Sequence, residues 1–347
     1  MYIIIAILLF GVLIFVHELG HYLTARIFKV AINEFSIGMG PKIFSWTSQK
    51  TAIAYSLRAL PIGGYVSMAG EDEESDNPNA FDKKPVWQRM IITVAGSVSN
   101  ILLAFIVMFV LVASTPEIGS TQISKFKDGA VSPDCGLQIG DVVTEVNGKD
   151  VHIARELIYF ISRYGTEPVD ITIRRNGETK VIENAVFAIA KDDNSGYVYG
   201  KADFYVNIAE KNLGSVIKNG FFESWLTIRM LVDSLVDMFS GKYGVEDLSG
   251  PVGVTTVIAD AAKTDMYQLW YIFVFIAMNL GVMNLLPFPA LDGGRLIVLM
   301  IELIIRRPVN KNVEGYINMA GMIILFTFMA FITVKDIGTL IKNFAGK

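Results

Sequence analysis

The chain has 347 residues, of which 52% are hydrophobic and 18% are charged, and its mean hydropathy is +0.45. Soluble domains carry about 25% charged residues, so this composition favours an integral membrane protein over a wholly soluble one. The net charge of -4 argues against a nucleic-acid partner. Cys135 is the single cysteine, which excludes a disulfide bond within the chain.

Four segments are apolar enough to cross a bilayer, which takes about 20 residues. They are residues 2–27, about 91–114, about 268–287 and about 316–334. The first resembles a signal peptide, but it lacks a basic start and a small-residue cleavage site, and it runs directly into a polar motif. We therefore interpret it as a retained helix.

The first span ends in HELGH, residues 17–21, which is an H-E-x-x-H motif. Residues four apart on a helix share one face, so His17 and His21 can both bind one zinc ion. Glu18 is rotated away from them and can exchange a proton with a water molecule at the metal. The alternative is two solvated histidines beside a surface glutamate, which the preceding apolar run disfavours.

Between the first two spans, residues 35–46 and 51–68 have strand-like patterns punctuated by glycine and proline. They predict a β-hairpin that lies against the membrane, and the polar stretch 71–85 predicts a loop. The edge of the hairpin could hold an unwound substrate as an added strand, or the hairpin could simply pack on the helices. Close backbone approach would be allowed by its glycines, which are Gly38, Gly40, Gly63 and Gly64.

Residues 115–210 have the pattern of a small α+β domain. We expect strands at 121–126, 141–148, 169–177 and 179–187, and an amphipathic helix at 152–165 that begins with the third histidine, His152. Asn-Gly pairs at 147–148 and 176–177 predict tight hairpin turns. After this domain, residues 219–241 predict a helix whose apolar face packs on the protein or lies in the membrane interface.

The third span leads into NLLPFPALDGGRL, residues 284–296. Pro287 and Pro289 interrupt the helix, and the glycine pair 293–294 allows tight turns. Irregular backbone at membrane depth is tolerated where it is buried or lines a water-filled cavity. Asp292 is therefore the candidate third zinc ligand, although it could instead, or also, cap the helix expected at 296–305.

Asn284 lies one turn before the proline break. An asparagine in a membrane helix needs a hydrogen-bond partner, which could be an extended substrate, an oxyanion or a neighbouring helix.

Lysine and arginine residues in the loop 28–90 and after the third span predict that both loops are cytoplasmic. The first and third spans then both run inward, which brings HELGH and Asp292 to the same depth near the cytoplasmic face. Residues 115–267 and both termini are expected outside.

HELGH, the pattern N-x-x-P-x-P-x-x-D-G-G at 284–294 and the small domain between them resemble the site-2 intramembrane metalloproteases of the bacterial RseP/RasP type. Three further stretches are similar to that family. GMGPKIFSW and ALPIGGYVSMAGE resemble its membrane-associated hairpin, LSGPVGVTTV resembles the segment before its third core helix, and SPDCGLQIGDVVTEVNGKDV, residues 132–151, resembles a PDZ domain.

The resemblance implies an α-helical polytopic membrane protein with about four transmembrane helices, a membrane-associated β-hairpin and one inserted α+β PDZ-like domain, where close relatives often carry two. It implies a Zn²⁺ site with Glu18 as the catalytic acid and base. The implied zinc ligands are His17, His21 and Asp292, and the implied substrate-binding residues are Asn284, Pro287 and Pro289, joined by Gly63 and Gly64 of the hairpin.

The expected division of the chain is a membrane core at 1–114, an extracytoplasmic PDZ-like domain at 115–210, a linker at 211–267 and a second part of the core at 268–347. The expected function is zinc-dependent intramembrane proteolysis in the bacterial cytoplasmic membrane. Its substrates would be transmembrane segments, such as those of anti-sigma factors or remnant signal peptides. Membrane lipid and a peptide C-terminus, held by backbone N–H groups of the loop GLQIGD, would be further partners.

Two other functions remain open from the sequence. The chain could be an inactive membrane-anchored PDZ adaptor, or a membrane zinc peptidase that acts on soluble peptides.

Overall fold

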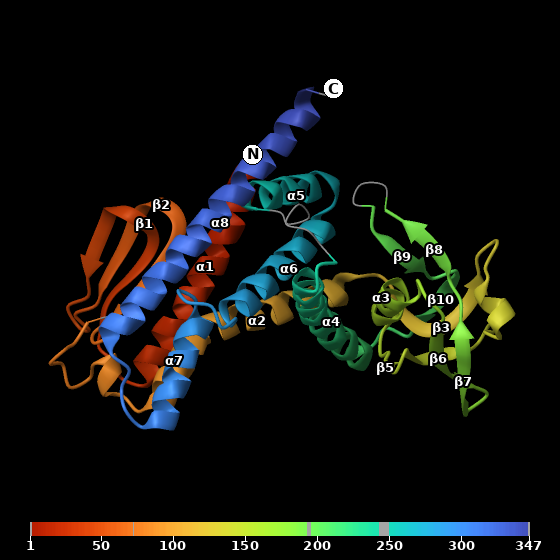
Figure 1. The fold of residues 1–347 in the computed structure, drawn as a ribbon, viewed down its shortest axis with the longest axis horizontal. Helices are drawn as coiled ribbons and strands as arrows, with labels where there is room; N and C mark the ends of the chain where they lie inside the picture. Colours follow the sequence, from red (N-terminus) through yellow and green to blue (C-terminus); the bar gives the residue numbers. More distant parts are fainter. Residues whose placement is uncertain (1, 72, 193–195, 243–249, 346–347) are drawn as a thin grey trace. The chain divides into compact units, whose positions relative to one another are not determined.

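The computed structural model describes residues 2–71, 73–192, 196–242 and 250–345 (Figure 1). The chain forms two compact units, one made of residues 1–104 and 237–347 and the other of residues 105–236.

Four helices of the structure are long and apolar enough to cross a membrane, and they coincide with the four predicted spans. Large apolar side chains on these helices remain exposed: Leu8, Leu102 and Phe331 are 62%, 57% and 60% exposed. Such surfaces are stable in a bilayer, and the chain is a multi-pass membrane protein. The helices are α1 (Tyr2–Ile27), α2 (Val86–Ser114), α6 (Met266–Asn284) and α8 (Lys311–Ala345).

Helix α6 ends at Asn284, three residues before the predicted end of the third span. Pro287 explains the early end, since proline lacks a backbone N–H and disfavours helical backbone in the residue before it. The next helix, α7 (Asp292–Ile305), contains the predicted run 296–305 and begins at Asp292 itself.

A further helix of this unit, α5 (Pro251–Thr264), was not predicted. Its first N–H groups are satisfied from a distant point in the chain, because Gly250 N and Gly253 N donate to Asp336 Oδ2 of α8 at 3.0 and 2.8 Å. The GPVG stretch is thus a helix start with a remote cap. Residues 248–249 of the LSGPVG motif lie outside the described residues.

The predicted hairpin is formed by β1 (Ile32–Thr47) and β2 (Ala54–Met68). Its pairing is doubled, which means that residues of one strand have partners in two segments of the other. Phe35 of β1 is opposite both Tyr55 and Val66 of β2, so the first half of β1 lies between two segments of β2. The strands must bend back on themselves to pair in this way. Three glycines have the positive φ angles that favour this residue, +85° at Gly38, +84° at Gly40 and +82° at Gly63.

A partly exposed ionic cluster holds the doubled hairpin together. Glu34 Oε1 accepts a hydrogen bond of 3.0 Å from Arg58 Nη2, and Glu34 Oε2 accepts one of 3.1 Å from Lys42 Nζ. Burial favours the protonated carboxyl, but the hydrogen bonds that the carboxylate accepts outweigh it and lower the pKa of Glu34 to about 2; the donors are Ser56, Lys42, Tyr65 and Arg58.

The second unit contains a mixed α+β domain. Its antiparallel sheet has the strand order β10-β3-β4-β6-β7, with β5 paired to β4, and β8 pairs with β9 separately. The predicted helix is α3 (Ala154–Tyr164), which packs against the sheet around Leu157 and Phe160. The strands are β3 (Ile118–Phe126), β4 (Val142–Val146), β5 (Lys149–Asp150), β6 (Val169–Arg175), β7 (Glu178–Ala185), β8 (Ala188–Lys191), β9 (Val198–Lys201) and β10 (Phe204–Ala209).

The four predicted strands of this domain are present, whereas β8, β9 and β10 were not predicted. Both Asn-Gly pairs form two-residue turns with positive φ, at +49° and +69° for 147–148 and at +53° and +87° for 176–177. These are the backbone angles of the hairpin turns that Asn-Gly favours.

The helix predicted at 219–241 is α4 (Leu213–Phe239), and one of its faces packs on α3. Phe222 stacks on the ring of His152 with centroids 3.8 Å apart. Tyr159 OH donates to Asp233 Oδ2 at 2.7 Å. The helix therefore has a face that packs on the protein, while Trp225 and Val236 remain 52% and 57% exposed.

The loop GLQIGD was predicted to offer backbone N–H groups to a peptide C-terminus. In the structure Gly136 N donates to Pro133 O, Gln138 N to Asp141 Oδ2 and Gly140 N to Ile123 O. The N–H groups at these three positions are therefore already engaged within the domain. Binding of a peptide C-terminus by this loop stays a prediction, and it would have to use the other backbone N–H groups of the loop.

Candidate metal centre and active site

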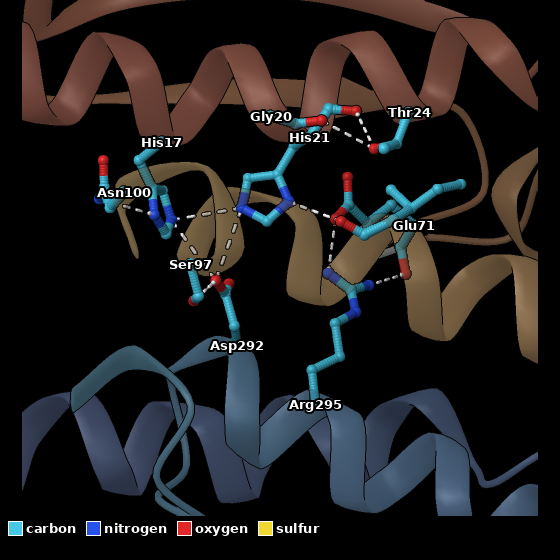
Figure 2. A network of polar contacts seen from close by, with 10 residues as sticks. His17, Gly20, His21, Thr24, Glu71, Ser97, Asn100, Asp292 and Arg295 are labelled. Atoms are coloured by element: carbon cyan, nitrogen blue, oxygen red, sulfur yellow. Dashed lines mark hydrogen bonds and ion pairs between the residues drawn. The ribbon is translucent and has the colours of Figure 1, made fainter. Parts of the chain in front are cut away.

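Three predicted zinc ligands meet in the first unit (Figure 2). His17 Nε2 and His21 Nε2 are 3.2 Å apart, and Asp292 Oδ2 lies 3.5 Å from the first and 3.6 Å from the second. The histidines project from α1 and the aspartate from the first turn of α7. Each histidine side chain is 13% exposed and that of Asp292 is 20% exposed, so the cluster is shielded but not closed to solvent.

The spacing of these atoms fits a tetrahedral zinc ion. Ligand atoms at 2.0–2.1 Å from zinc in tetrahedral directions are about 3.3 Å apart, and the three observed separations are 3.2, 3.5 and 3.6 Å. Two imidazoles and one carboxylate form a donor set that zinc accepts, and three protein ligands leave a fourth position open. The residues present can therefore hold Zn²⁺.

Helix α2 orients His21 and Asp292. His21 Nδ1 is 2.8 Å from Ile92 O, and a carbonyl can only accept, so the proton is on Nδ1 and the Nε2 lone pair faces the cluster. Ser97 Oγ donates to Asp292 Oδ2 at 2.8 Å. The backbone of α2 is also close, since a Cβ at Gly96 would lie 2.2 Å from His21 Nε2.

The contribution of α2 was not predicted from the sequence. Its only signal is a row of small and polar residues within an apolar span, GSVSN at 96–100. Gly20 on α1 permits the close approach, because a Cβ there would lie 2.4 Å from Ala95 O. Small residues at such a contact let two membrane helices pack backbone to backbone.

The glycines after Asp292 have a different role from the one predicted. They lie within α7 and not in a turn, and a Cβ at Gly293 would lie 2.2 Å from Leu286 O. A Cβ at Gly294 would lie 2.3 Å from Phe288 O. Glycine is needed at both positions because the proline-containing loop folds back onto the start of the helix.

Glu18 lies beside the inner segment of β2. Its carboxyl is close enough to His21 and Asp292 to interact with them electrostatically, and it faces the backbone of Val66. A Cβ at Gly64 would lie 3.0 Å from Glu18 Cγ. The hairpin therefore brings its strand 64–66 directly to the candidate acid and base.

The remaining predicted residues surround the end of α6. Asn284 is its last residue and is half-buried, and among the described residues its side chain makes no hydrogen bond. Pro287 is exposed and Pro289 is half-buried. Their loop rests on α8, where Asn318 Oδ1 accepts a hydrogen bond of 3.2 Å from Ala290 N.

Residues 5–328 match the family described as Peptidase family M50. The chain belongs to peptidase family M50. This range includes HELGH and Asp292, and it confirms the family that the sequence resembles.

Relatives in family M50 match nearly the whole chain. A protein of Fusobacterium nucleatum, provisionally named a zinc metalloprotease, is 36% identical over 96% of this chain and 97% of its own. Regulator of sigma-W protease RasP of Bacillus subtilis is 28% identical over 95% of this chain and 97% of its own. Zinc metalloprotease RasP of Geobacillus kaustophilus is 29% identical over 95% of this chain and 96% of its own.

One solved structure, the PDZ domain of the SdrC-like protein from Listeria monocytogenes, is 16% identical and covers 28% of this chain and 90% of that one. Its TM-score of 0.18 supports no conclusion.

The family and its full-length relatives confirm the expected activity and cofactor. The chain is a zinc-dependent metalloprotease of the site-2, intramembrane type.

Proposed function

We propose that His17, His21 and Asp292 are the zinc ligands of this protease and that Glu18 is its catalytic acid and base. The observation that carries the proposal is the meeting of three donor atoms, 3.2–3.6 Å apart, from two distant segments of the chain. Zinc bound there would lower the pKa of a water molecule toward about 7 and polarise the scissile carbonyl.

The residues of the chain supply the proton transfers and the orientation. Glu18 takes a proton from the attacking water and delivers it to the leaving amine nitrogen, which is general base and then general acid catalysis. The carbonyl of Ile92 and the hydroxyl of Ser97 keep His21 and Asp292 aligned. We assign to the amide of Asn284 a hydrogen bond to a substrate carbonyl.

The substrate must be extended at the site, because a helical peptide bond is shielded by its own hydrogen bonds. We propose that the segment of β2 containing Gly63 and Gly64 holds it by strand addition, with Pro287 and Pro289 on the opposing loop. The proximity of Gly64 and Val66 to Glu18 supports this placement.

The hairpin is suited to the membrane. Apolar side chains are concentrated on its outer part, where Ile43, Phe44 and Trp46 are 68%, 62% and 55% exposed. Exposed apolar area of this kind marks contact with lipid or another protein.

The proposed substrates are transmembrane segments of membrane proteins, including anti-sigma factors or remnant signal peptides. The name of the Bacillus subtilis relative, which refers to sigma-W regulation, supports this class. We place the site near the cytoplasmic face of the bacterial inner membrane and residues 115–210 outside it, as a PDZ-like domain. The chain then consists of a core at 1–114, that domain, a linker at 211–267 and a core at 268–347.

An adaptor without activity is disfavoured, because the zinc donors and Glu18 are all present and the donors are correctly spaced. No observation favours a peptidase for soluble peptides over the proposed one.

The decisive experiment compares metal content with cleavage. Purified protein should hold about one zinc ion, and His17→Ala or Asp292→Ala should weaken its binding, because the remaining two ligands cannot complete the site. Glu18→Gln should keep zinc and lose cleavage of a model transmembrane substrate. Glu73→Gln, which changes an exposed carboxylate, is the matched control and should do neither. Full activity with Glu18→Gln would refute the assignment.

A further inference from the structure

Asn100 is a fully buried residue of α2 in direct contact with the proposed zinc ligands. Its exposed fraction is 0%, and its side-chain Nδ2 lies 3.5 Å from His17 Nδ1 (Figure 2). Among the described residues, its Oδ1 is buried and has no hydrogen-bond partner. Buried polar atoms are normally paired, so this amide needs an explanation.

The chemistry of His17 constrains what the amide can present. His17 Nε2 faces His21 Nε2 and Asp292 Oδ2, and it can bind zinc only through a lone pair. The ring proton must then be on Nδ1, the atom that faces Asn100. The backbone carbonyl of Gly96 also faces the His17 ring, and a carbonyl requires a ring N–H as its donor.

An amide nitrogen facing a ring N–H places two donors against each other. The oxygen and nitrogen of an asparagine amide have nearly the same shape, so the group can turn by half a rotation without repacking. The turned amide leaves one of its atoms unpaired, as the original does, but it replaces a donor–donor contact with an N–H···O hydrogen bond.

We infer that Asn100 presents Oδ1 to the Nδ1–H of His17 and is a positioning residue that fixes the zinc-binding tautomer of that ring. This inference rests on the proposed zinc site. Asn100 does for His17 what the carbonyl of Ile92 does for His21, and Ser97 orients Asp292 by donating a hydrogen bond to Oδ2. One face of α2 thus serves all three ligands.

The test measures zinc affinity in the full-length protein, in detergent, by competition with a chromophoric chelator. Asn100→Leu has a similar volume and no polar atom, and loss of such a partner should weaken zinc binding about 10–100-fold. Asn100→Asp retains only acceptors and should stay within about threefold of the wild type. Thr93→Val, which removes another buried hydroxyl of α2, is the control and should leave the affinity unchanged.

The visible spectrum of the cobalt-substituted protein provides a second readout. It should shift with Asn100→Leu, because the His17 ring reorients, and should be restored with Asn100→Asp. A purely structural role would not give rescue by the carboxylate.

If the Asn100→Leu protein has the zinc affinity and cobalt spectrum of the wild type, the inference is overturned, and the Gly96 carbonyl is sufficient to orient the His17 ring. Equal losses in the Leu and Asp variants would overturn it too, because the amide would then be the donor. If Asn100→Leu does not fold, Asn100→Asp decides alone, and a tenfold or greater loss of affinity refutes the inference. Failure of the wild type to bind zinc would instead refute the proposed function.

Discussion

Replacing Gly96 by alanine should disable the metal centre without weakening α2. The added Cβ would lie 2.2 Å from His21 Nε2, whereas carbon and nitrogen need about 3.5 Å between them. The ring cannot swing aside easily, because its Nδ1 is held by Ile92 O at 2.8 Å. Either the ring or the helix must therefore move by about 1.3 Å, the difference between the required and available distances.

A displacement of this size is large for a metal site, where ligand distances are held to about 0.2 Å. A misplacement of about 1 Å at a catalytic site can lower the rate about 100-fold. We therefore expect the Gly96→Ala protein to lose most of its zinc and its cleavage rate to fall at least about 100-fold. Helix propensity favours alanine over glycine by about 1 kcal/mol, so a weakened helix would not explain the loss.

The assay is cleavage of a model transmembrane substrate by enzyme in vesicles, with zinc content measured on the same samples. Gly11→Ala is the matched control, since it adds the same group to α1 at a point where nothing lies within 4 Å, and it should behave as the wild type. Wild-type zinc content and turnover in Gly96→Ala would refute the geometry that we describe for α1 and α2.

Three other outcomes are expected. In a Cys135→Ser background, engineered cysteines near residue 150 and at the C-terminus should react with an impermeant reagent from outside, and one at residue 75 should not; labelling at 75 in intact cells would reverse the proposed orientation. Replacing residues 117–210 by a short flexible bridge is geometrically simple, because Ile118 and Ala209 are paired in the sheet. The shortened protein should still cleave a minimal helical substrate and should also cleave substrates with intact ectodomains. If a zinc-loaded shortened protein cleaves neither substrate, the domain is part of the catalytic machinery. Since the pKa of Glu34 is lowered from 4.5 to about 2, its carboxylate stabilises the folded state above pH 4.5 and that contribution is lost as the pH falls toward 2. Glu34→Gln should therefore lower the melting temperature at neutral pH and flatten its decline in that window, and an unchanged pH profile would contradict the role of the cluster.

The sequence by itself determined the features that depend on local spacing. Apolar runs of sufficient length predicted all four spans, since crossing a bilayer is a requirement of length and composition. The two Asn-Gly turns followed from the backbone angles that these residues tolerate. The shared face of His17 and His21 is a consequence of helical periodicity. Asp292 could be proposed because carboxylates are rare at membrane depth and its loop is broken by prolines.

Only the tertiary structure decided which groups meet across distant segments. Three features depend on contacts between residues far apart in the chain. They are the face of α2 that holds His21 and Asp292, the remote cap of α5 by Asp336, and the doubled pairing of β1 and β2. A single sequence contains no periodic signal for such contacts. The glycines after Asp292 show the same limit. The sequence predicted that they allow tight turns, whereas a Cβ at Gly293 is excluded by a carbonyl 2.2 Å away, and that contact exists only once the loop has folded back onto α7.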